Sequence, residues 1–463
     1  MSFQSLREML QRLWRSGFAD PAARGRGAGI APGLYHFMYE LAGEPTRFHL
    51  RVDSSGNGIL LANASAAARL RPSGVILAKG LLEGDDDSVL FERLCRTFRD
   101  VPVEEAKQDI RRVLGVIHQL AESTGDYPMI NLADPTFTPE ADRLDLPLSA
   151  DVPLADPERM VPLLDRMWEL GIPHVTVVAG KQPDTMALVR AVERAEDLGM
   201  IAGVRASGSV LSQGTLVRDL ARAGVDHLDV LYLAAAPGLH DTLVGAGDHE
   251  RAVAAFRLAR ENEVCPVAEI ALTLATAEVV DHTIRSLRGH GIGTAALFAL
   301  ATDAADPFPG TAMDAPLACD ALIQVAATVE ETADAVGVRL LWYPPVEFLP
   351  GKSLAEQACA GPRTSGDTAV RVEPDGAVIP ARGPRLTGGN LLADPWPRIY
   401  QSEAFRNYRA RVERDTHCDH CPGLVICSAD CPRSPQGWAR EAVDSHGDAS
   451  RRQTSPKENG HEA

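Results

Sequence analysis

An alternation of short apolar runs with amphipathic segments between Arg143 and Pro344 constrains the fold most strongly. Strands that are buried on both faces read as continuous apolar runs, and parallel neighbours need a crossover helix between them. The pattern therefore predicts an α/β fold with a partial (β/α) TIM-type barrel over residues 143–345. The expected strands are Arg143–Ala150, His174–Ala179, Met200–Ala206, His227–Ala234, Pro266–Leu272, Thr294–Ala301 and Val338–Tyr343.

The first βα unit has clear helix start and stop signals. Asp156 can cap a helix, Pro157 suits its first position, and Gly171 suits its end. Barrel enzymes place their chemistry on the loops that follow the strands. The first four such loops, predicted at 151–155, 179–184, 207–209 and 235–241, are poor in cysteines, paired carboxylates and clustered histidines.

Charge and composition exclude several function classes. The net charge of −17 comes without a long basic stretch, so nucleic-acid binding is not expected. No run of about 18 apolar residues exists, so no membrane-spanning helix is expected. The N-terminal residues lack the apolar core of a secretory signal, and a cytoplasmic location is predicted. Four of the eight cysteines fall in one short cluster, which suits a metal site better than disulfides.

Changes in composition predict the domain boundaries. We expect an N-terminal helix (Phe3–Trp14) and linker over 1–32, a small α+β domain over 33–122 and a Pro-containing linker over 123–142. The barrel over 143–345 is then followed by a Cys-rich module over 346–436 and a disordered tail over 437–463.

The segment 33–122 carries strand patterns at Thr46–Asp53 and Gly58–Leu61, a possible third at Leu34–Leu41, and helical patterns at Gly74–Leu82, Ser88–Phe98 and Val103–Ala121. This order resembles the PqqD-like, winged-helix recognition domain of peptide-modification systems. The resemblance implies that an extended leader peptide adds a strand to the edge of the sheet. The alternative is a domain that only braces the barrel.

A cysteine cluster with the spacing C-x2-C-x5-C-x3-C predicts a zinc or iron–sulfur site formed by Cys418, Cys421, Cys427 and Cys431. The alternative is four unliganded core cysteines. The spacing resembles the SPASM module, whose other signatures are matched by Cys359, 375–380, 388–392 and 402–405. Residues 33–436 as a whole resemble radical S-adenosylmethionine (SAM)/SPASM enzymes that modify peptides, and by this resemblance Cys359 is a further metal ligand.

The departures from that family are concentrated at the barrel. The family binds its catalytic iron–sulfur cluster through C-x3-C-x2-C after the first strand, but here no cysteine lies between Cys95 and Cys265. Lys181 stands where the family's Gly-Gly-Glu-Pro motif has the glutamate that meets the cofactor's ammonium group, and like charges repel. The SPASM-like module is also incomplete, since Ala381 replaces a ligand and no cysteine follows Cys431.

These features predict a radical SAM/SPASM-like protein without its catalytic cluster, for which SAM is not an expected cofactor. Its expected partner is a peptide or a cysteine-complete radical SAM protein. Two alternatives remain: non-radical chemistry at the barrel mouth, or radical chemistry with a cluster supplied from elsewhere. The candidate catalytic residues are Lys181, His240, Asp241 and Glu269, although a structural role is favoured for the His240–Asp241 pair and a buried Glu269 needs a partner.

Overall fold

The computed structural model describes residues 29–41, 44–62, 66–121, 146–301, 315–317, 319–343, 346–347, 351–360, 369–379 and 387–406. Contacts between Cα atoms divide the described residues into two compact units. The smaller unit contains residues 52–58 and 69–117, and the larger contains the strands at 33–51 and 59–68 together with everything from residue 118 onward. Each unit is described separately below.

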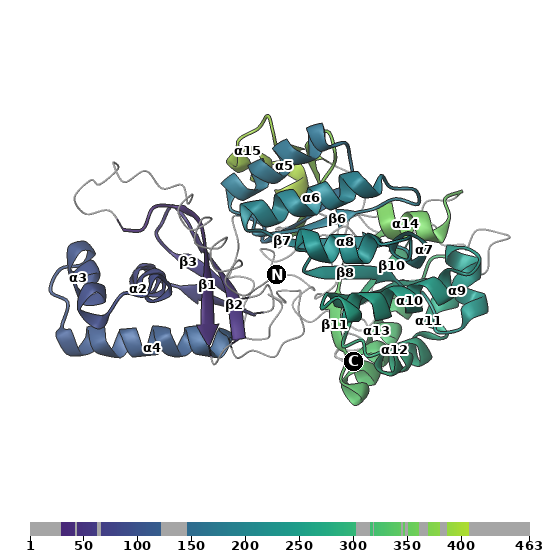
Figure 1. Cartoon of the computed structure of the whole chain (residues 1–463), viewed down its shortest axis with the longest axis horizontal. Coiled ribbons are helices and arrows are strands. Elements are labelled where there is room, and N and C mark those ends of the chain that lie inside the picture. Colours follow the sequence, from purple (N-terminus) through teal and green to yellow (C-terminus); the bar gives the residue numbers. More distant parts are fainter. Residues whose placement is uncertain are drawn as a thin grey trace, which may run out of the picture. The chain divides into compact units, whose positions relative to one another are not determined.

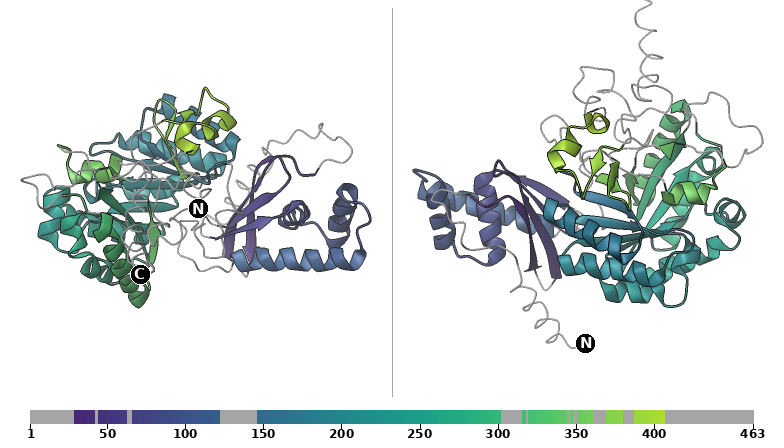
Figure 2. Two further views of the ribbon diagram at one scale, coloured as in Figure 1. Left: turned by 180° about the vertical axis from the view of Figure 1, so that it is seen from behind. Right: turned by 90° about the horizontal axis from the view of Figure 1, so that it is seen from above.

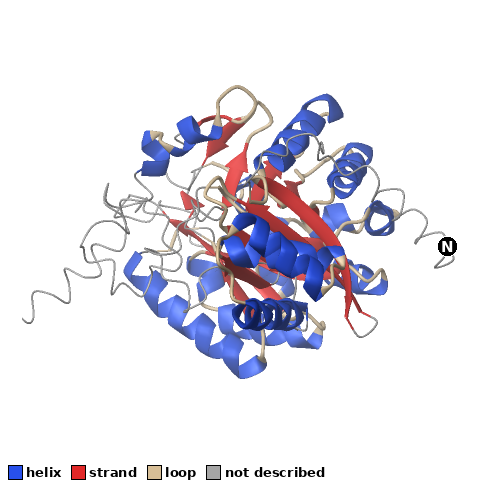
Figure 3. Ribbon diagram, turned by 90° about the vertical axis from the view of Figure 1, so that its left-hand side faces the viewer, coloured by secondary structure: helices blue, strands red, loops and turns tan. Residues whose placement is uncertain are grey.

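The larger unit is built on an 11-stranded sheet of order β11-β10-β9-β8-β7-β6-β5-β13-β14-β15, with β12 (Val346–Glu347) paired to β10. The seven strands from β5 to β11 are parallel, and helices that follow them lie around the outside of the sheet (Figure 1, Figure 2 and Figure 3). Within the described residues the sheet does not close on itself. The predicted partial (β/α) barrel is confirmed.

The strands of this barrel are β5 (Ser149–Pro153), β6 (His174–Val178), β7 (Ile201–Ala206), β8 (His227–Leu231), β9 (Cys265–Leu272), β10 (Thr294–Ala301) and β11 (Arg339–Trp342). The helices between them are α5 (Pro157–Leu170), α6 (Thr185–Leu198), α7 (Gly208–Leu211), α8 (Leu216–Ala223), α9 (Pro237–Val244), α10 (Asp248–Glu261), α11 (Leu274–Ala277), α12 (Val280–Gly289) and α13 (Cys319–Val336).

Local sequence explains where α5 begins and ends. Pro157 occupies its first turn, and Gly171 ends it in the left-handed region at φ 89°, where a residue with a Cβ atom would be strained. Asp156 stands at the N-cap as predicted, but its side chain makes no capping hydrogen bond. The helix buries Met160, Leu163, Leu164 and Met167 in the main core of the barrel.

The predicted position of the first barrel strand was wrong. The sequence ended it at Ala150 and assigned 151–155 to a loop, whereas β5 runs from Ser149 to Pro153 and pairs Asp151 with Thr176. The preceding Leu148 misled the assignment because it is buried in a separate small cluster with Ile59 and Leu61. Asp151 is therefore a strand residue, and its place in β5 fixes the face of the sheet toward which its side chain points.

The N-terminal sheet has the order β1-β2-β3-β4, with β1 (Gly33–Leu41), β2 (Glu44–Val52), β3 (Gly58–Ala62) and β4 (Ala66–Leu70). The three predicted strands are present, and β4 was missed because Ala66-Ala67-Ala68 lacks the β-branched and aromatic residues typical of strands. The smaller unit carries the helices α2 (Pro72–Glu83), α3 (Asp87–Thr97) and most of α4 (Val103–Ala121). Asp86 caps α3 by accepting hydrogen bonds from the amides of Ser88 and Val89.

The C-terminal part extends the barrel sheet on the β5 side through β13 (Ala369–Val372), β14 (Ala377–Ile379) and β15 (Gly389–Asn390). It also contributes α14 (Leu354–Ala360) and α15 (Trp396–Tyr400). The N-terminal segment Phe3–Trp14, the linker 123–142, the tail and Cys418, Cys421, Cys427 and Cys431 lie outside the described residues. No helix in the described ranges is both long enough and apolar enough to cross a membrane.

Candidate functional site

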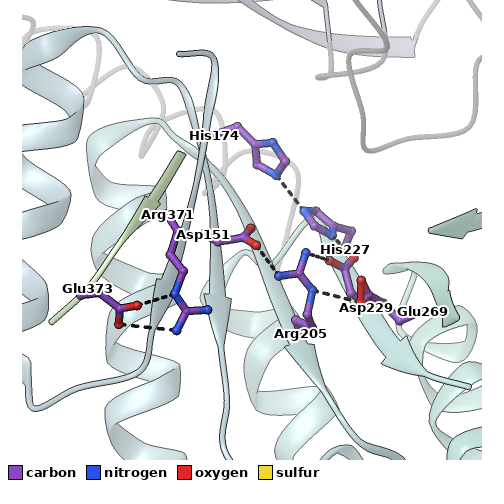
Figure 4. A network of polar contacts seen from close by, with 8 residues as sticks. All are labelled: Asp151, His174, Arg205, His227, Asp229, Glu269, Arg371 and Glu373. Carbon is purple, nitrogen blue, oxygen red and sulfur yellow. Dashed lines mark hydrogen bonds and ion pairs between the residues drawn. The ribbon is translucent and has the colours of Figure 1, made fainter. Parts of the chain in front are cut away.

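A buried layer of charged side chains lies on the inner face of the barrel sheet (Figure 4). Side chains alternate between the two faces of a strand, so Val204 and Ala206 on β7 join the outer core and Arg205 points inward. Arg205 is 2% exposed and lies against three carboxylates from neighbouring strands. These are Asp151 on β5, Asp229 on β8 and Glu269 on β9.

The guanidinium of Arg205 contacts one carboxylate through each nitrogen. Its Nη1 donates to Asp151 Oδ2 at 2.5 Å, Nε lies 3.1 Å from Glu269 Oε2, and Nη2 lies 3.5 Å from Asp229 Oδ2. The last two contacts have ion-pair distances but lack the alignment of a hydrogen bond. The ring of Tyr343 lies 5.7 Å from Cζ of Arg205 and covers the group from another side.

The charges in this layer depend on one another. Burial alone would lower the pKa of Arg205, but Asp151 and Glu269 outweigh it and hold the pKa well above its usual value. Burial raises the pKa of Asp229, and the opposing effect of His227 and Arg205 is larger, so the net shift is downward. Arg205 is therefore charged at neutral pH, and His227 and Arg205 together keep Asp229 ionised in a place where an isolated carboxylate would take up a proton.

Two histidines extend the layer along the inner face. His227 Nδ1 lies 2.8 Å from Asp229 Oδ1, and its Nε2 lies 2.9 Å from Nε2 of His174 on β6. Burial and the neighbouring His227 lower the pKa of His174 to about 3, so His174 is neutral at physiological pH. Gly203 on β7 makes room for this pair, because a Cβ atom there would lie 2.0 Å from Cε1 of His227.

The layer continues into the C-terminal part of the chain. Arg371 on β13 is paired in register with Asp151 on β5 and is 4% exposed. Its Nε donates to Glu373 Oε1 at 2.7 Å. Arg371 and Glu373 form their own ion pair beside the Arg205 cluster, so residues more than 200 positions apart in the sequence lie next to one another in this layer (Figure 4).

The sequence candidates have different surroundings. Glu269 is fully buried and belongs to the charged layer, with Arg205 as the partner that its burial required. Lys181 is exposed, and its Nζ lies 3.4 Å from Ser353 Oγ and 3.5 Å from Glu356 Oε1. Lys181 and Glu269 therefore have different partners and do not form a shared site among the described residues.

His240 and Asp241 hold the corner between α9 and α10. The buried His240 accepts from the amide of Leu233 at Nδ1 (3.1 Å) and contacts Asp248 Oδ2 at Nε2 (3.0 Å). Asp241 accepts from the amides of Gly247 (2.8 Å) and His249 (2.9 Å). Both ring nitrogens of His240 and both oxygens of Asp241 thus have structural partners in the fold.

The chain's own helix α14 covers part of the inner face. Its Leu354, Ala355 and Ala358 belong to the same buried cluster as Leu233 at the end of β8 and Phe298 on β10. Ser353 and Glu356 form a capping box at its start, and Lys181 contacts both residues. An apolar layer closed by α14 therefore lies beside the charged layer.

Cys359 is also on α14, while the other four cysteines of the predicted metal site are outside the described ranges.

The donor set of the barrel does not fit a cysteine-bound cluster. Cys265, at the start of β9, is the only cysteine in the sequence between residues 146 and 301, and a C-x3-C-x2-C cluster needs three thiolates. In the described part of the chain, no group of three or more His, Cys, Asp or Glu side chains could hold a metal ion.

The missed residues of the charged layer are Asp151, His174, Arg205, His227 and Asp229. Their signal was the polar side chains recurring every second position in apolar strands, as in His227-Leu228-Asp229 and His174-Val175-Thr176. These residues lie within strands, whereas barrel chemistry was expected on the loops that follow the strands.

No family model matches the chain. The solved structure of SuiB from Streptococcus suis is similar over 83% of this chain and 94% of that chain, with a TM-score of 0.51 and 12% identity. SuiB bound to the precursor peptide SuiA matches over 86% and 95%, with a TM-score of 0.50 and 11% identity. At these identities the likeness shows a shared fold.

Among curated proteins, large ribosomal subunit protein uL5 of Rubrobacter xylanophilus is 31% identical over 102 residues, which is 22% of this chain and 56% of that protein. This chain therefore spans about half the length of the curated relative that it matches. The matched segment is too small a share of the chain to identify it.

Replacing Arg205 with Met should lower the free energy of unfolding at pH 7 by about 3 kcal/mol or more, because three buried carboxylates lose their cation. The loss should shrink as pH falls. In the parent, the lowered pKa of Asp229 gives stability that is present above the unfolded-state pKa and lost at lower pH. In the variant, the loss of the Arg205 cation raises the pKa values of the three buried carboxylates. They therefore take up protons as the pH falls, and their mutual repulsion disappears.

Urea unfolding between pH 7 and pH 4 measures this difference. The matched control is Arg398→Met, which breaks an ion pair to Asp394 at a side chain that is 76% exposed and should cost less than about 1 kcal/mol. Equal effects of the two substitutions at pH 7 would contradict a buried charged layer.

Proposed function

We propose that this protein is a radical SAM/SPASM-like protein that binds a peptide or a partner protein and performs no radical chemistry itself. The observation that carries the proposal is the inner face of the barrel, where a self-paired charged layer and α14 occupy the sheet and the thiolates for a catalytic cluster are missing. Supporting the peptide-binding part, SuiB, whose fold this chain shares, has been solved bound to the precursor peptide SuiA.

Lys181 gives a second reason to exclude SAM from this function. Its ammonium follows β6 at the position that resembles the family's cofactor-binding motif, and it is held near Ser353 and Glu356 of the α14 capping box. The methionyl ammonium of SAM would meet a cation there in place of a carboxylate.

Peptide binding is assigned to the four-stranded sheet. β1 and β4 are the edge strands of its order among the described residues, and an extended peptide can add a strand at the edge of a sheet. The sheet also braces the barrel, since Arg47 contacts Glu196 at 3.0 Å, His49 contacts the Gly199 carbonyl at 2.8 Å and Arg51 donates to the Pro147 carbonyl at 2.8 Å. These polar contacts come from β2, and β1 also packs on α5, where the ring centroids of His36 and Trp168 lie 5.9 Å apart.

A structural metal completes the proposal. Cys418, Cys421, Cys427 and Cys431 would hold one zinc ion or iron–sulfur cluster, with Cys359 as the further ligand that the SPASM resemblance implies. A non-radical enzyme has less support, because Lys181, His240 and Asp241 contact structural partners and do not gather around Glu269.

The purified full chain, reconstituted with iron and sulfide without oxygen, should not produce 5′-deoxyadenosine from SAM and a strong reductant. The reason is the missing cysteines between Cys95 and Cys265. Chromatography of the products measures it, with a cysteine-complete radical SAM enzyme as the positive control. Product above background that persists after further purification would refute the proposal.

Candidate precursor peptides from neighbouring genes should bind the full chain with a dissociation constant on the order of micromolar, because ordering an extended peptide costs free energy. Hydrogen exchange should then slow in β1 or β4 and remain unchanged in β6 to β9. Protection confined to the barrel, or no saturable binding, would leave bracing as the role of the sheet.

The double substitution Cys418→Ser and Cys421→Ser should release the bound metal and lower the melting temperature, because structural metal binding contributes folding free energy. Metal analysis measures the release, and the colour of the parent distinguishes an iron–sulfur cluster from zinc. The matched control is Cys95→Ser, at an exposed cysteine on α3. A parent without metal would make the four cysteines packing residues.

A further inference from the structure

Histidines gather where strands β1 and β2 meet the barrel, all within the larger unit. The ring of His49 on β2 is fully buried, and its Nε2 lies 2.8 Å from the carbonyl oxygen of Gly199 at the end of α6. The ring of His36 on β1 lies 6.4 Å from that of His49. Both rings meet Trp168 on α5 edge-on, with centroids 5.9 Å and 6.5 Å away. These four residues form a junction between the sheet and the barrel.

Hydrogen bonding fixes the position of the proton on His49. A carbonyl oxygen only accepts, so Nε2 carries the hydrogen and donates it to Gly199. The other ring nitrogen, Nδ1, is buried and has no hydrogen-bond partner in the described part of the chain. A second proton, on Nδ1, would create a buried N–H without an acceptor and a cation near Arg47. Burial outweighs the hydrogen bond to Gly199 and lowers the pKa of His49 to about 3, so His49 is neutral in the docked sheet.

A second histidine pair near His49 resists protonation in a similar way. His227 faces the carboxylate of Asp229 through Nδ1 and faces His174 through Nε2, so a single hydrogen lies between the two Nε2 atoms, which are 2.9 Å apart. Another proton there would set two N–H groups against each other. His49 is close enough to His174 for a positive charge on one to disfavour a positive charge on the other.

The charged groups that face the junction come from both sides. Arg47 on β2 lies 3.0 Å from Glu196 on α6 and 3.9 Å from Asp226, and Arg51 on β2 donates to the Pro147 carbonyl. Inside the barrel, Arg205 adds a second cation near His174. Burial raises the pKa of Glu196, so this carboxyl strengthens docking as the pH falls. Glu196 therefore acts against the histidines, and a test has to separate the two effects.

We propose that this junction is an acid-sensitive latch, in which β1 and β2 stay docked on the barrel while His49 is neutral and are released when His49 takes up a proton. On the released sheet, His49 has the ordinary pKa of 6.5, so its contribution to docking is complete above that pH and is lost as the pH falls toward 3. Between pH 7 and pH 5, His49 alone raises the equilibrium constant for release about 25-fold. The latch acts on the bracing contacts of the sheet and is independent of peptide binding.

The test follows the fluorescence of Trp168 in the full chain during urea unfolding at pH 7 and pH 5. Far-ultraviolet circular dichroism reports on the whole chain in the same samples, and subtraction of the signal from Trp168→Phe assigns the fluorescence change to that side chain. At pH 5 the Trp168 transition should precede the circular dichroism transition, and it should move to lower urea by more than the circular dichroism transition does. The fitted constant for release should rise about 25-fold.

A variant isolates the effect of His49 from that of Glu196. His49→Gln keeps an N–H donor for Gly199 and cannot titrate, so it should lose the 25-fold rise. The matched control is His282→Gln, at an exposed histidine on α12, which should behave as the parent. A His49→Gln chain that keeps the parent's pH dependence would overturn the proposal. So would a parent whose Trp168 transition does not move with pH, or moves no more than the circular dichroism transition, and this comparison needs no variant of His49.

Discussion

The pairing of Arg205 with Asp151, Asp229 and Glu269 is the interaction on which the interior of this barrel depends. Unpaired carboxylates in a buried place would cost several kcal/mol each or take up protons. One guanidinium touching strands β5, β8 and β9 from β7 makes a polar inner face compatible with an apolar outer core. The same arrangement explains the histidine pair and Gly203. His227 contacts Asp229, and its ring lies over Gly203, where a larger residue would not fit.

This pairing also limits what the barrel can do. The charged groups of the inner face contact one another and α14 packs beside them, while Nε and Nη2 of Arg205 and Nη1 of Arg371 are buried without a hydrogen-bond partner in the described part of the chain. The chain shares its fold with SuiB, and its own candidate residues contact other parts of the same chain, as Lys181 does with Glu356 and Glu269 with Arg205. The proposed binding role rests on this arrangement of the inner face.

The architecture could be predicted because its signals are local. Apolar runs gave the parallel strands, and Pro157 and Gly171 marked the ends of α5 within the sequence itself. The charged layer could not be predicted, because it depends on strand register, which pairs Arg205 with Asp229 and Arg371 with Asp151 across long separations. The strand β5 also ends later in the sequence than predicted, so Asp151 lies in the strand and points inward, where a loop residue had been expected. Glu269 was found from sequence as a residue that needed a partner, but Arg205 was not identified as that partner.

Calorimetric titration of the anaerobically purified full chain with SAM tests the central claim most directly, because binding must precede any radical chemistry. We predict no saturable heat at millimolar SAM for the parent. The Lys181→Glu variant, which restores the carboxylate of the family motif, should remain silent because the cluster thiolates are still missing. Saturable binding by the parent that is lost on substitution of Asp229 or Glu269 would show an inner face open to ligand and would contradict this account.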